Sequence, residues 1–261
     1  MPQDTAARSA LGLALQAELT GSPPRDASSP MEQSWRDFVY AEVWSRPGLD
    51  RRARFLISFA GAAVIGHVHA MEAYARGALT TGELSLAELR EAALHVAVYC
   101  GWSAGSQLDG AVSRQAADLG LPPATCAPII GTHASAQARM ESGATGFHEV
   151  MTFDGPQPGG DSPFLQHGIL NFVFAEMWCR PGLDQRSRRW LTLVGVCESC
   201  ADTPIKSHIH AAMASGNCSA DELHEFVLQY AIHAGWPKAS RIQGEVYAMA
   251  AKFAKGLAWN G

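Results

Sequence analysis

Apolar residues recur along the chain at the spacing of amphipathic helices, and the strict alternation that is typical of half-buried strands is nearly absent. The pattern predicts one helix before the first Arg-Pro-Gly, two helices across residues 51–81, one over 86–100 and one after Trp102. Similar apolar patterns follow in the second half of the chain. The sequence therefore predicts an all-α protein.

Short polar motifs indicate where these helices begin and end. An Asp that follows Pro-Gly-Leu is placed to cap a helix, Ser-x-x-Glu is the signature of a capping box, and a Gly stops a helix. Each motif occurs twice, at Asp50 and Asp184, at Ser85/Glu88 and Ser219/Glu222, and at Gly101 and Gly235. The two sets of motifs predict two similar groups of helices.

An internal repeat relates the two halves of the chain. The segment AEVWSRPGLDRRARFL at 41–56 corresponds to AEMWCRPGLDQRSRRW at 175–190, with a constant offset of 134 residues, Arg180 minus Arg46. The offset persists without gaps over some sixty residues and also relates Trp102 to Trp236. A repeat of this length indicates a duplicated helical unit rather than a solenoid of short repeats.

The composition of the remaining segments suggests where the units end. Residues 20–31, TGSPPRDASSPM, have the composition of a mobile segment, so we expect 1–30 to be a flexible leader. The stretch 121–163 is rich in Pro, Gly, Ser and Thr and is expected to be a linker with room for one short helix. The two units are then predicted at 31–120 and 164–261.

Charge and cysteine content narrow the class of protein. The net charge is −5 and no long basic run occurs, so the sequence does not favour nucleic-acid binding. Six cysteines over 261 residues are too few for a disulfide scaffold, which favours a reducing, cytoplasmic compartment. The longest apolar stretch, FLISFAGAAVIGHVHAM, contains two histidines and is shorter than the roughly 20 residues of a membrane span. We therefore expect a soluble, cytoplasmic protein.

The repeated motifs resemble those of a known family. RPGLDxRxR, a helix of small residues, His-x7-Gly, [ST]xxEL and Y-x-G-W together resemble carboxymuconolactone decarboxylase domains of the AhpD-like superfamily, and the resemblance covers both repeats. It implies two tandem AhpD-like all-α units. Family members usually form rings of small subunits, often hexamers, so the resemblance implies a homo-oligomer, a trimer of two-unit chains. The superfamily includes cofactor-free decarboxylases of a γ-carboxylated lactone and thiol-dependent peroxidases.

The segment CESC, with Cys197 and Cys200, raises the peroxidase alternative. The peroxidase branch carries Cys-x-x-Cys-x-x-x-His, and His208 matches the family histidine because a Gly follows it eight residues later. The positions that match the two cysteines are then occupied by Ala201 and Pro204. The actual pair therefore lies four residues too early.

The position of these cysteines relative to the helices also argues against a reactive thiolate. Asp202-Thr203-Pro204 predicts a helix N-terminus with Asp202 as the cap, so Cys197 and Cys200 belong to the end of the preceding helix. A helix C-terminus carries negative partial charge, which disfavours a thiolate. We interpret the pair as core or pocket lining, with a redox role as the alternative.

His208 and Glu176 are the candidate catalytic residues. A histidine has an unperturbed pKa near neutrality and the family match places His208 at a pocket, although its counterpart in the first repeat is Tyr74. Glu42 and Glu176 recur before the Trp of the repeated motif, where a carboxyl group in apolar surroundings is expected to have a raised pKa. The alternative for His208 is a hydrogen-bonded histidine between helices.

Candidate substrate-binding residues come from both repeats. Arg186 and Arg188 lie in a first helical turn, where an arginine is poorly placed for the helix dipole, so each is expected to face a carboxylate. That carboxylate is either Glu42 or Glu176 in an ion pair or an anionic substrate. His95 and Tyr99 share one helix face, and His233 occupies the position equivalent to Tyr99; these three line a pocket or form a polar seam between subunits.

No cofactor is expected for a decarboxylase of this kind. If a metal is present, the predicted ligands are one histidine from each of several helices: His69, His95, His208 and His233. The two residues of a His-x-His pair on a helix point in different directions and do not bind one ion together.

The sequence thus predicts a cofactor-independent lyase that decarboxylates a small anionic or lactone-type substrate. Arg186 or Arg188 is expected to hold the substrate carboxylate, while His208 and Glu176 handle the proton. The alternatives are an oxidoreductase, either a thiol peroxidase through Cys197 and Cys200 or a multi-histidine metal-dependent oxygenase, and a non-enzymatic oligomeric scaffold.

Overall fold

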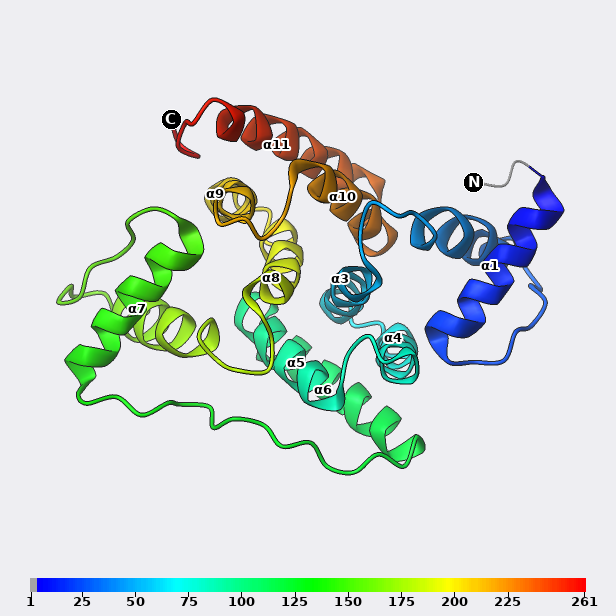
Figure 1. Ribbon diagram of the computed structural model, residues 1–261, viewed down its shortest axis with the longest axis horizontal. Helices are drawn as coiled ribbons and strands as arrows, with labels where there is room; N and C mark the ends of the chain where they lie inside the picture. The colour runs from blue at the N-terminus through cyan, green and yellow to red at the C-terminus, as the bar shows by residue number, and fades with distance from the viewer. Residues whose placement is uncertain (1–3) are drawn as a thin grey trace.

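The structure is a computed structural model that describes residues 4–261, which form helices and loops without a β-strand. The first half contains α1 (Thr5–Thr20), α2 (Pro30–Ser34), the π-helix η1 (Trp35–Trp44), α3 (Arg51–Val64), α4 (Val68–Thr81), α5 (Leu86–Cys100) and α6 (Trp102–Asp118). The second half contains α7 (Ala136–Met151), the π-helix η2 (Phe164–Met177), α8 (Gln185–Glu198), α9 (Asp202–Ala214), α10 (Ala220–Ala234) and α11 (Trp236–Ala254). The all-α prediction is confirmed (Figure 1).

The helix starts predicted from the motifs that recur in both repeats are also confirmed. The carboxylate of Asp50 accepts from the backbone N–H of Ala53 at 2.7 Å, and that of Asp184 accepts from Ser187 at the same distance. Both capping boxes form, at the starts of α5 and α10. These local interactions satisfy backbone donors that no intrahelical carbonyl reaches.

The flexible leader expected at residues 1–30 is wrong for residues 5–20, which form helix α1. Asp4 caps this helix, and Leu15 and Leu19 are buried in the main core. The linker expected at 121–163 contains one helix, for which the sequence analysis left room, but this helix, α7, has 16 residues. Both helices were obscured in the sequence by the Pro- and Gly-rich segments that follow them.

Helices α1 and α7 occupy equivalent places in the two halves. Their bounds differ by 131 residues, Ala136 minus Thr5, instead of the 134 that relates the later helices. Arg8 on α1 binds Glu42 at 2.8 Å, and Arg139 on α7 binds Glu176 at 2.8 Å. The duplicated unit therefore begins one helix earlier than the sequence motifs indicated.

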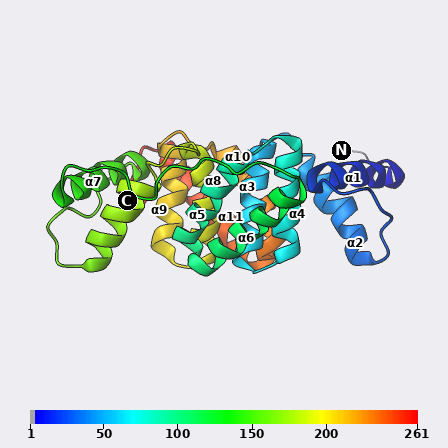
Figure 2. The same ribbon diagram turned by 90° about the horizontal axis from the view of Figure 1, so that it is seen from below.

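The two units share one hydrophobic core because equivalent helices exchange partners. Helices α3 and α8 pack against each other, α5 of the first unit packs on α8, and α10 of the second unit packs on α3. The pairs α1–η1 and α7–η2 lie at opposite ends of the long axis (Figures 1 and 2). Residues of both units thus meet at two equivalent places in the interior.

The long π-helices η1 and η2 are unusual, because π-helical geometry mostly occurs as single turns near functional sites. Each carries a Glu that binds α1 or α7 and leads into a Trp that packs inward. Within the described part of the chain, every helix is too short or too polar to cross a bilayer.

Candidate functional site

The structure brings together six side chains from both units, five of them buried and Tyr99 partly buried. We call them the arginine–histidine cluster: His95, Tyr99, Trp178, Arg189, Thr192 and His208. His95 and Tyr99 come from α5 of the first unit. The other four come from the end of η2 and from α8 and α9 of the second unit. The cluster contains three residues that the sequence analysis selected, and it joins them across the two repeats.

Hydrogen bonds and ring contacts connect the members of this cluster. His95 Nε2 lies 2.8 Å from Thr192 Oγ1, and Trp178 Nε1 donates to the Tyr99 hydroxyl at 2.8 Å. The rings of Tyr99 and His208 meet edge to face, with centroids 5.7 Å apart. Such a network holds its side chains in defined positions.

Arg189 stands out because its guanidinium is fully buried and no carboxylate among residues 4–261 lies within salt-bridge distance. Its nitrogens donate to His208 Nδ1 at 3.2 Å, to the Val150 carbonyl at 2.5 Å and to Asn217 Oδ1 at 3.3 Å. The guanidinium carbon lies 4.9 Å from the centre of the Trp178 ring. Burial lowers the pKa of Arg189 to about 10, so the group remains charged at neutral pH.

The other two fully buried arginines show how uncommon this is. Arg54 lies 3.1 Å from Glu225, and Arg188 lies 3.4 Å from Glu91. Burial of a charge without a counterion destabilises the folded state by several kcal/mol. Of the three fully buried arginines, Arg189 is the one for which the described chain supplies no carboxylate. Arg189 is therefore equipped to receive an anion.

The two histidines of the cluster are neutral. Burial, followed by the positive charge of Arg189, places the pKa of His208 well below its usual range. Burial and the charges of Arg188 and Arg189 do the same for the pKa of His95. Since His208 Nδ1 accepts from Arg189, the proton of the neutral ring belongs on Nε2. His95 Nδ1 is buried and has no hydrogen-bond partner in the described chain.

Helix α7 covers the cluster from the outside. Val150 and Met151 at its end are buried against Phe174, Trp178 and Ala211 in a small apolar cluster of their own. The carbonyl of Val150 accepts directly from Arg189. The cover excludes water and so strengthens the electrostatic interactions beneath it.

Glu176, predicted to act together with His208, lies at a different junction. Its carboxylate accepts from the Gly131 backbone N–H at 2.8 Å, lies 2.9 Å from His133 Nε2 and pairs with Arg139 at 2.8 Å. None of the contacts found for this buried carboxylate is with His208. Its position suits attachment of α7 and the preceding loop to η2.

Arg186 and Arg188 also lie outside the cluster. Arg186 pairs with Glu222 at 2.7 Å and with Asp50 at 2.8 Å, while Arg188 pairs with Glu91 across the two units. The ion pairs suggested with Glu42 and Glu176 are therefore wrong, because those two carboxylates bind arginines of α1 and α7 instead. Arg188 thus joins the two units, and Arg186 joins Asp50 of the first unit to Glu222 in the first turn of α10.

The four histidines named as alternative metal ligands are not gathered. The side chain of His69 is 93% exposed. His233 lies against Tyr74, with its Nε2 3.3 Å from the Tyr74 hydroxyl. Between Asp4 and Gly261, His, Cys, Asp and Glu side chains do not form a group of three or more that would hold an ion.

The cysteines lie where the helix argument placed them. Cys197 is buried near the end of α8, where burial raises the pKa of its thiol, and Cys200 is exposed in the turn that follows. The predicted cap is wrong by one residue, because α9 begins at Asp202 itself. The Asp202 carboxylate binds Arg241 and so does not cap the helix.

Sequence reasoning missed Arg189, which follows Arg188 directly. The motif RPGLDxRxR draws attention to the arginines that recur in both repeats, whereas the counterpart of Arg189 is Phe55. One signal in the sequence could have identified Arg189: it is a charged residue at a position where the other repeat has the aromatic residue Phe55.

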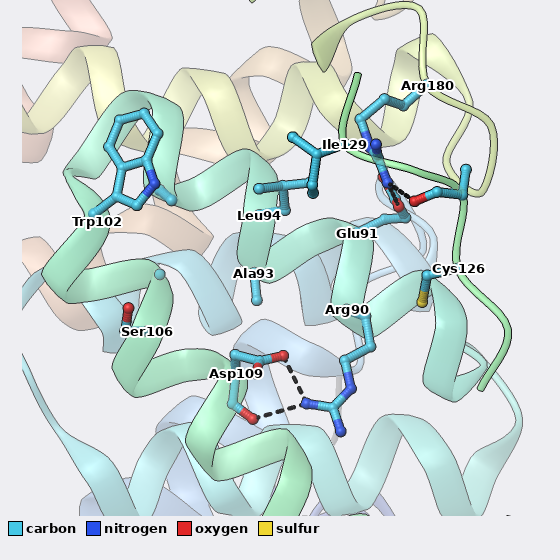
Figure 3. A pocket seen from close by; sticks show the side chains of 13 residues that line it. Arg90, Glu91, Ala93, Leu94, Trp102, Ser106, Asp109, Cys126, Ile129 and Arg180 are labelled. Atoms are coloured by element: carbon cyan, nitrogen blue, oxygen red, sulfur yellow. Dashed lines mark hydrogen bonds and ion pairs between the residues drawn. The ribbon is translucent and has the colours of Figure 1, made fainter. Parts of the chain in front are cut away.

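A cavity of about 370 Å³ lies elsewhere, between α5, α6 and residues 126–129 (Figure 3). Arg180 and Glu91 form an ion pair on one side of it, and Arg90 and Asp109 form another. Members of the arginine–histidine cluster do not line it. Its charged walls are already paired, in contrast to Arg189.

Comparison with known proteins agrees with the repeated architecture. The chain is 40% identical over 74 residues to the nitrosuccinic acid decarboxylase of Metarhizium robertsii, a match that covers 28% of this chain and half the length of that relative. It is 28% identical over 120 residues to the 4-carboxymuconolactone decarboxylase of Acinetobacter baylyi, covering 43% of this chain and 89% of that protein. The model of the carboxymuconolactone decarboxylase family matches residues 30–112 and again 163–242. The chain therefore belongs to the carboxymuconolactone decarboxylase family and carries its domain twice.

Proposed function

We propose that the protein is a cofactor-independent decarboxylase of a small carboxylated anion, and that the arginine–histidine cluster is its active site. The family and the decarboxylase names of both relatives support the reaction class. The observation that carries the choice of site is the buried Arg189 guanidinium, which pairs with no carboxylate among residues 4–261.

In this proposal the substrate carboxylate binds Arg189 and supplies the missing counterion. The bond between the carboxyl carbon and its neighbour then breaks, CO2 leaves, and the electron pair spreads into an adjacent carbonyl, lactone or nitro group. A dry, preorganised site favours this dispersed charge over the localised carboxylate. The cover by α7 and the apolar residues around Val150 supply that environment.

His208 is proposed to deliver the proton that replaces CO2. Its Nε2–H is free of the bond to Arg189, and the Tyr99 ring meets the imidazole edge to face. An anion on Arg189 cancels part of the positive field that holds the pKa of His208 low. Substrate binding therefore makes the imidazole easier to protonate: Nδ1 takes a proton from solvent, Nε2–H passes its proton to the carbon that lost CO2, and the ring returns to its neutral form.

The single charge of Arg189 and the apolar residues around it favour a small substrate with one carboxylate at the reacting end. A carboxylated lactone is the first choice and a nitro-substituted carboxylic acid is the second, because each offers a carboxylate next to a group that accepts electrons. Glu176 is proposed to contribute through the cover, by its bonds to Arg139 and His133, and less through direct proton transfer.

The experiment measures CO2 release from 4-carboxymuconolactone and from nitrosuccinate. Arg189→Gln is expected to lower kcat/KM at least ~10²-fold, because it removes a buried charge-assisted contact to the substrate. His208→Gln is expected to lower kcat while KM stays within a few-fold, since its role belongs to the proton step. Glu176→Gln tests the direct proton role and should have a smaller effect on kcat than His208→Gln.

Arg241→Gln, on α11 away from the cluster, is the matched control for loss of an arginine. The proposal fails if Arg189→Gln folds normally and retains the activity of the control. Absence of CO2 from either substrate in the unaltered protein would instead favour a binding scaffold.

A further inference from the structure

An extended segment of the chain lies on the outer face of the second unit, and we call its residues 126–131 the strap. Figure 1 shows the stretch that contains it running along one edge of the molecule, between α6 and α7. Arg180 donates to two consecutive strap carbonyls, those of Ala127 and Pro128. These contacts use backbone atoms of the strap, so the arginine recognises an extended chain.

The strap is also held at its far end and through one side chain. Glu176 accepts from the Gly131 backbone N–H at 2.8 Å. Between these two anchors, the side chain of Ile129 lines the same cavity as Leu94 and Trp102 (Figure 3). The strap therefore binds through an arginine, a carboxylate and an apolar wall.

The first unit carries an equivalent face on η1, the turn that follows it, α10 and α11. The offset of 134 residues places the same residue types there: an arginine, two glutamates, a leucine and a tryptophan. These residues form what we call the Arg46 face: Arg46, Glu42, Glu225, Leu228 and Trp236. The tryptophan is 56% exposed and packs on a phenylalanine of η1, as its counterpart packs on one of η2. The surface on which the strap lies is thus present twice.

The Arg46 face has no strap of its own among residues 4–261. The strap precedes α7, and the offset of 131 that relates α1 to α7 places its equivalent ahead of these residues. The side chain of Arg46 is accordingly 36% exposed, whereas that of Arg180 is 4% exposed. The side chain of Glu42 is 29% exposed, and that of Glu176 is 4% exposed. The described chain leaves this face open to solvent.

The atoms that would hold a strap are also unused on the Arg46 face. Arg46 donates to Glu225 through Nε and Nη2, and its Nη1 makes no hydrogen bond within the described chain. The corresponding nitrogen of Arg180 donates to a strap carbonyl. Glu42 accepts from Arg8 at 2.8 Å through one oxygen, which leaves the other available. The face therefore offers a donor and an acceptor where the strap binds in the second unit.

We propose that the Arg46 face binds an extended segment of a partner protein in the manner of the strap. Consecutive carbonyls of that segment accept from Arg46, and an N–H three residues further on donates to Glu42. The apolar side chain between these anchors packs on Leu228 and Trp236. Binding of this kind combines main-chain hydrogen bonds with one side-chain contact that gives specificity.

The strap itself indicates which segment fits. Pro128 favours an extended chain and has no N–H that would need an acceptor, and Ile129 supplies the apolar side chain. A proline followed by a branched apolar residue is therefore the class of segment that we infer. The strap of a second copy is already held by its own Arg180 and Glu176, so the segment belongs to a different protein. This inference does not depend on the proposed decarboxylation.

The test uses a fluorescein-labelled peptide of residues 123–131 that carries Cys126→Ser, titrated with the full chain and followed by fluorescence anisotropy. Arg46→Gln is expected to weaken binding at least ~10-fold, because it removes a charge-assisted hydrogen bond. Trp236→Ala is expected to weaken it about 5- to 10-fold, as for loss of an aromatic contact. Trp102→Ala, on the face that the strap already covers, is the matched control and should leave the affinity unchanged.

The specificity of the peptide and the independence from catalysis are measured in parallel. Ile129→Asp in the peptide is expected to weaken binding at least ~10-fold, since it places a carboxylate against the apolar wall. Release of CO2 by Trp236→Ala should equal that of the unaltered protein. If Arg46→Gln does not melt cooperatively, Trp236→Ala decides, because its side chain is exposed and outside the core.

Three outcomes overturn the proposal. The first is that the peptide does not bind at millimolar concentration. The second is that Trp236→Ala and Trp102→Ala change its affinity equally. The third is that sedimentation shows dimers of the chain that Trp236→Ala abolishes, which would assign the Arg46 face to a second copy.

Discussion

At the scale of single residues, the interior of this protein depends on imidazoles that stay neutral. Burial lowers the pKa of His95, His208 and His233, whereas the unfolded chain binds a proton at each of them near pH 6.5. Below that pH the unfolded state binds protons at these histidines and the folded state does not. The stabilising contribution of these histidines is therefore complete above pH ~6.5 and is lost as the pH falls toward the folded-state pKa values.

We accordingly expect the free energy of unfolding to decrease from pH ~6.5 to ~4, by up to about 1.4 kcal/mol per pH unit for each histidine. His95→Gln should reduce this slope, because Gln229 already occupies the equivalent buried position. Urea unfolding at a series of pH values measures it, with the exposed His69→Gln as the control for loss of an imidazole. A slope unaltered by His95→Gln would contradict the neutral, buried state of that ring.

Some residue roles could be predicted from the sequence and others could not. The capping aspartates and the capping boxes were predictable because each acts on backbone atoms three residues away. Arg189 was not, since its significance depends on a missing carboxylate, and only the folded structure shows which charges lie near one another. Arg186 and Arg188 have the same side chain but different neighbours, and so different roles.

At the scale of helices, close backbone contacts hold α1 against η1 and α7 against η2. A Cβ at Gly12 would lie 1.9 Å from the Arg36 carbonyl oxygen, and one at Gly143 would lie 2.1 Å from that of Leu170. These positions are equivalent in the two units. Each glycine permits a helix to lie directly on the backbone of the adjacent π-helix.

Gly143→Ala is therefore expected to push α7 away from η2 and to admit water above Arg189. Overpacking of this kind costs about 1–3 kcal/mol, so we expect a lower Tm, faster hydrogen exchange over residues 136–151 and reduced CO2 release. Gly12→Ala is the matched control, since it places the same clash at the first unit's end of the molecule. Gly12→Ala should lower the Tm by a similar amount but leave the hydrogen exchange of α7 unchanged. An equal loss of CO2 release in both variants would argue against a local role of α7 above Arg189.

The helices of the repeated motif were predictable from periodicity and caps, whereas α1 and α7 were not. The repeat changes its offset from 134 to 131 before the motif begins, so a constant shift does not align these two helices. The Arg8–Glu42 and Arg139–Glu176 pairs reveal their equivalence only once the helices are packed.

At the scale of the whole molecule, the arginine–histidine cluster requires helices from both units. His95 and Tyr99 of the first unit contact Thr192 and His208 of the second, and Tyr74 of the first unit contacts His233 of the second. The units share one core through α3, α5, α8 and α10. An unbroken chain at residues 121–123 is therefore not needed to hold the two units together.

A protease site inserted at the exposed residues 121–123 tests this arrangement. The cleaved halves are expected to remain together on size exclusion and to keep their CO2 release, because the shared core holds them. Each half purified alone after denaturation should be inactive, and mixing the refolded halves should restore activity. Activity in the isolated second half would show that Arg189 and His208 suffice without α5.

The sequence by itself determined the helices of the repeated motif, the caps that recur in both repeats, the duplication and the family, because each depends on residues close together in the chain or on motifs that repeat. Only the tertiary structure decided that both units contribute to the arginine–histidine cluster, that no carboxylate among residues 4–261 pairs with Arg189, and that Glu176 binds α7 instead of His208. Those features depend on distances between helices far apart in sequence. Packing fixes such distances, and no local pattern encodes them.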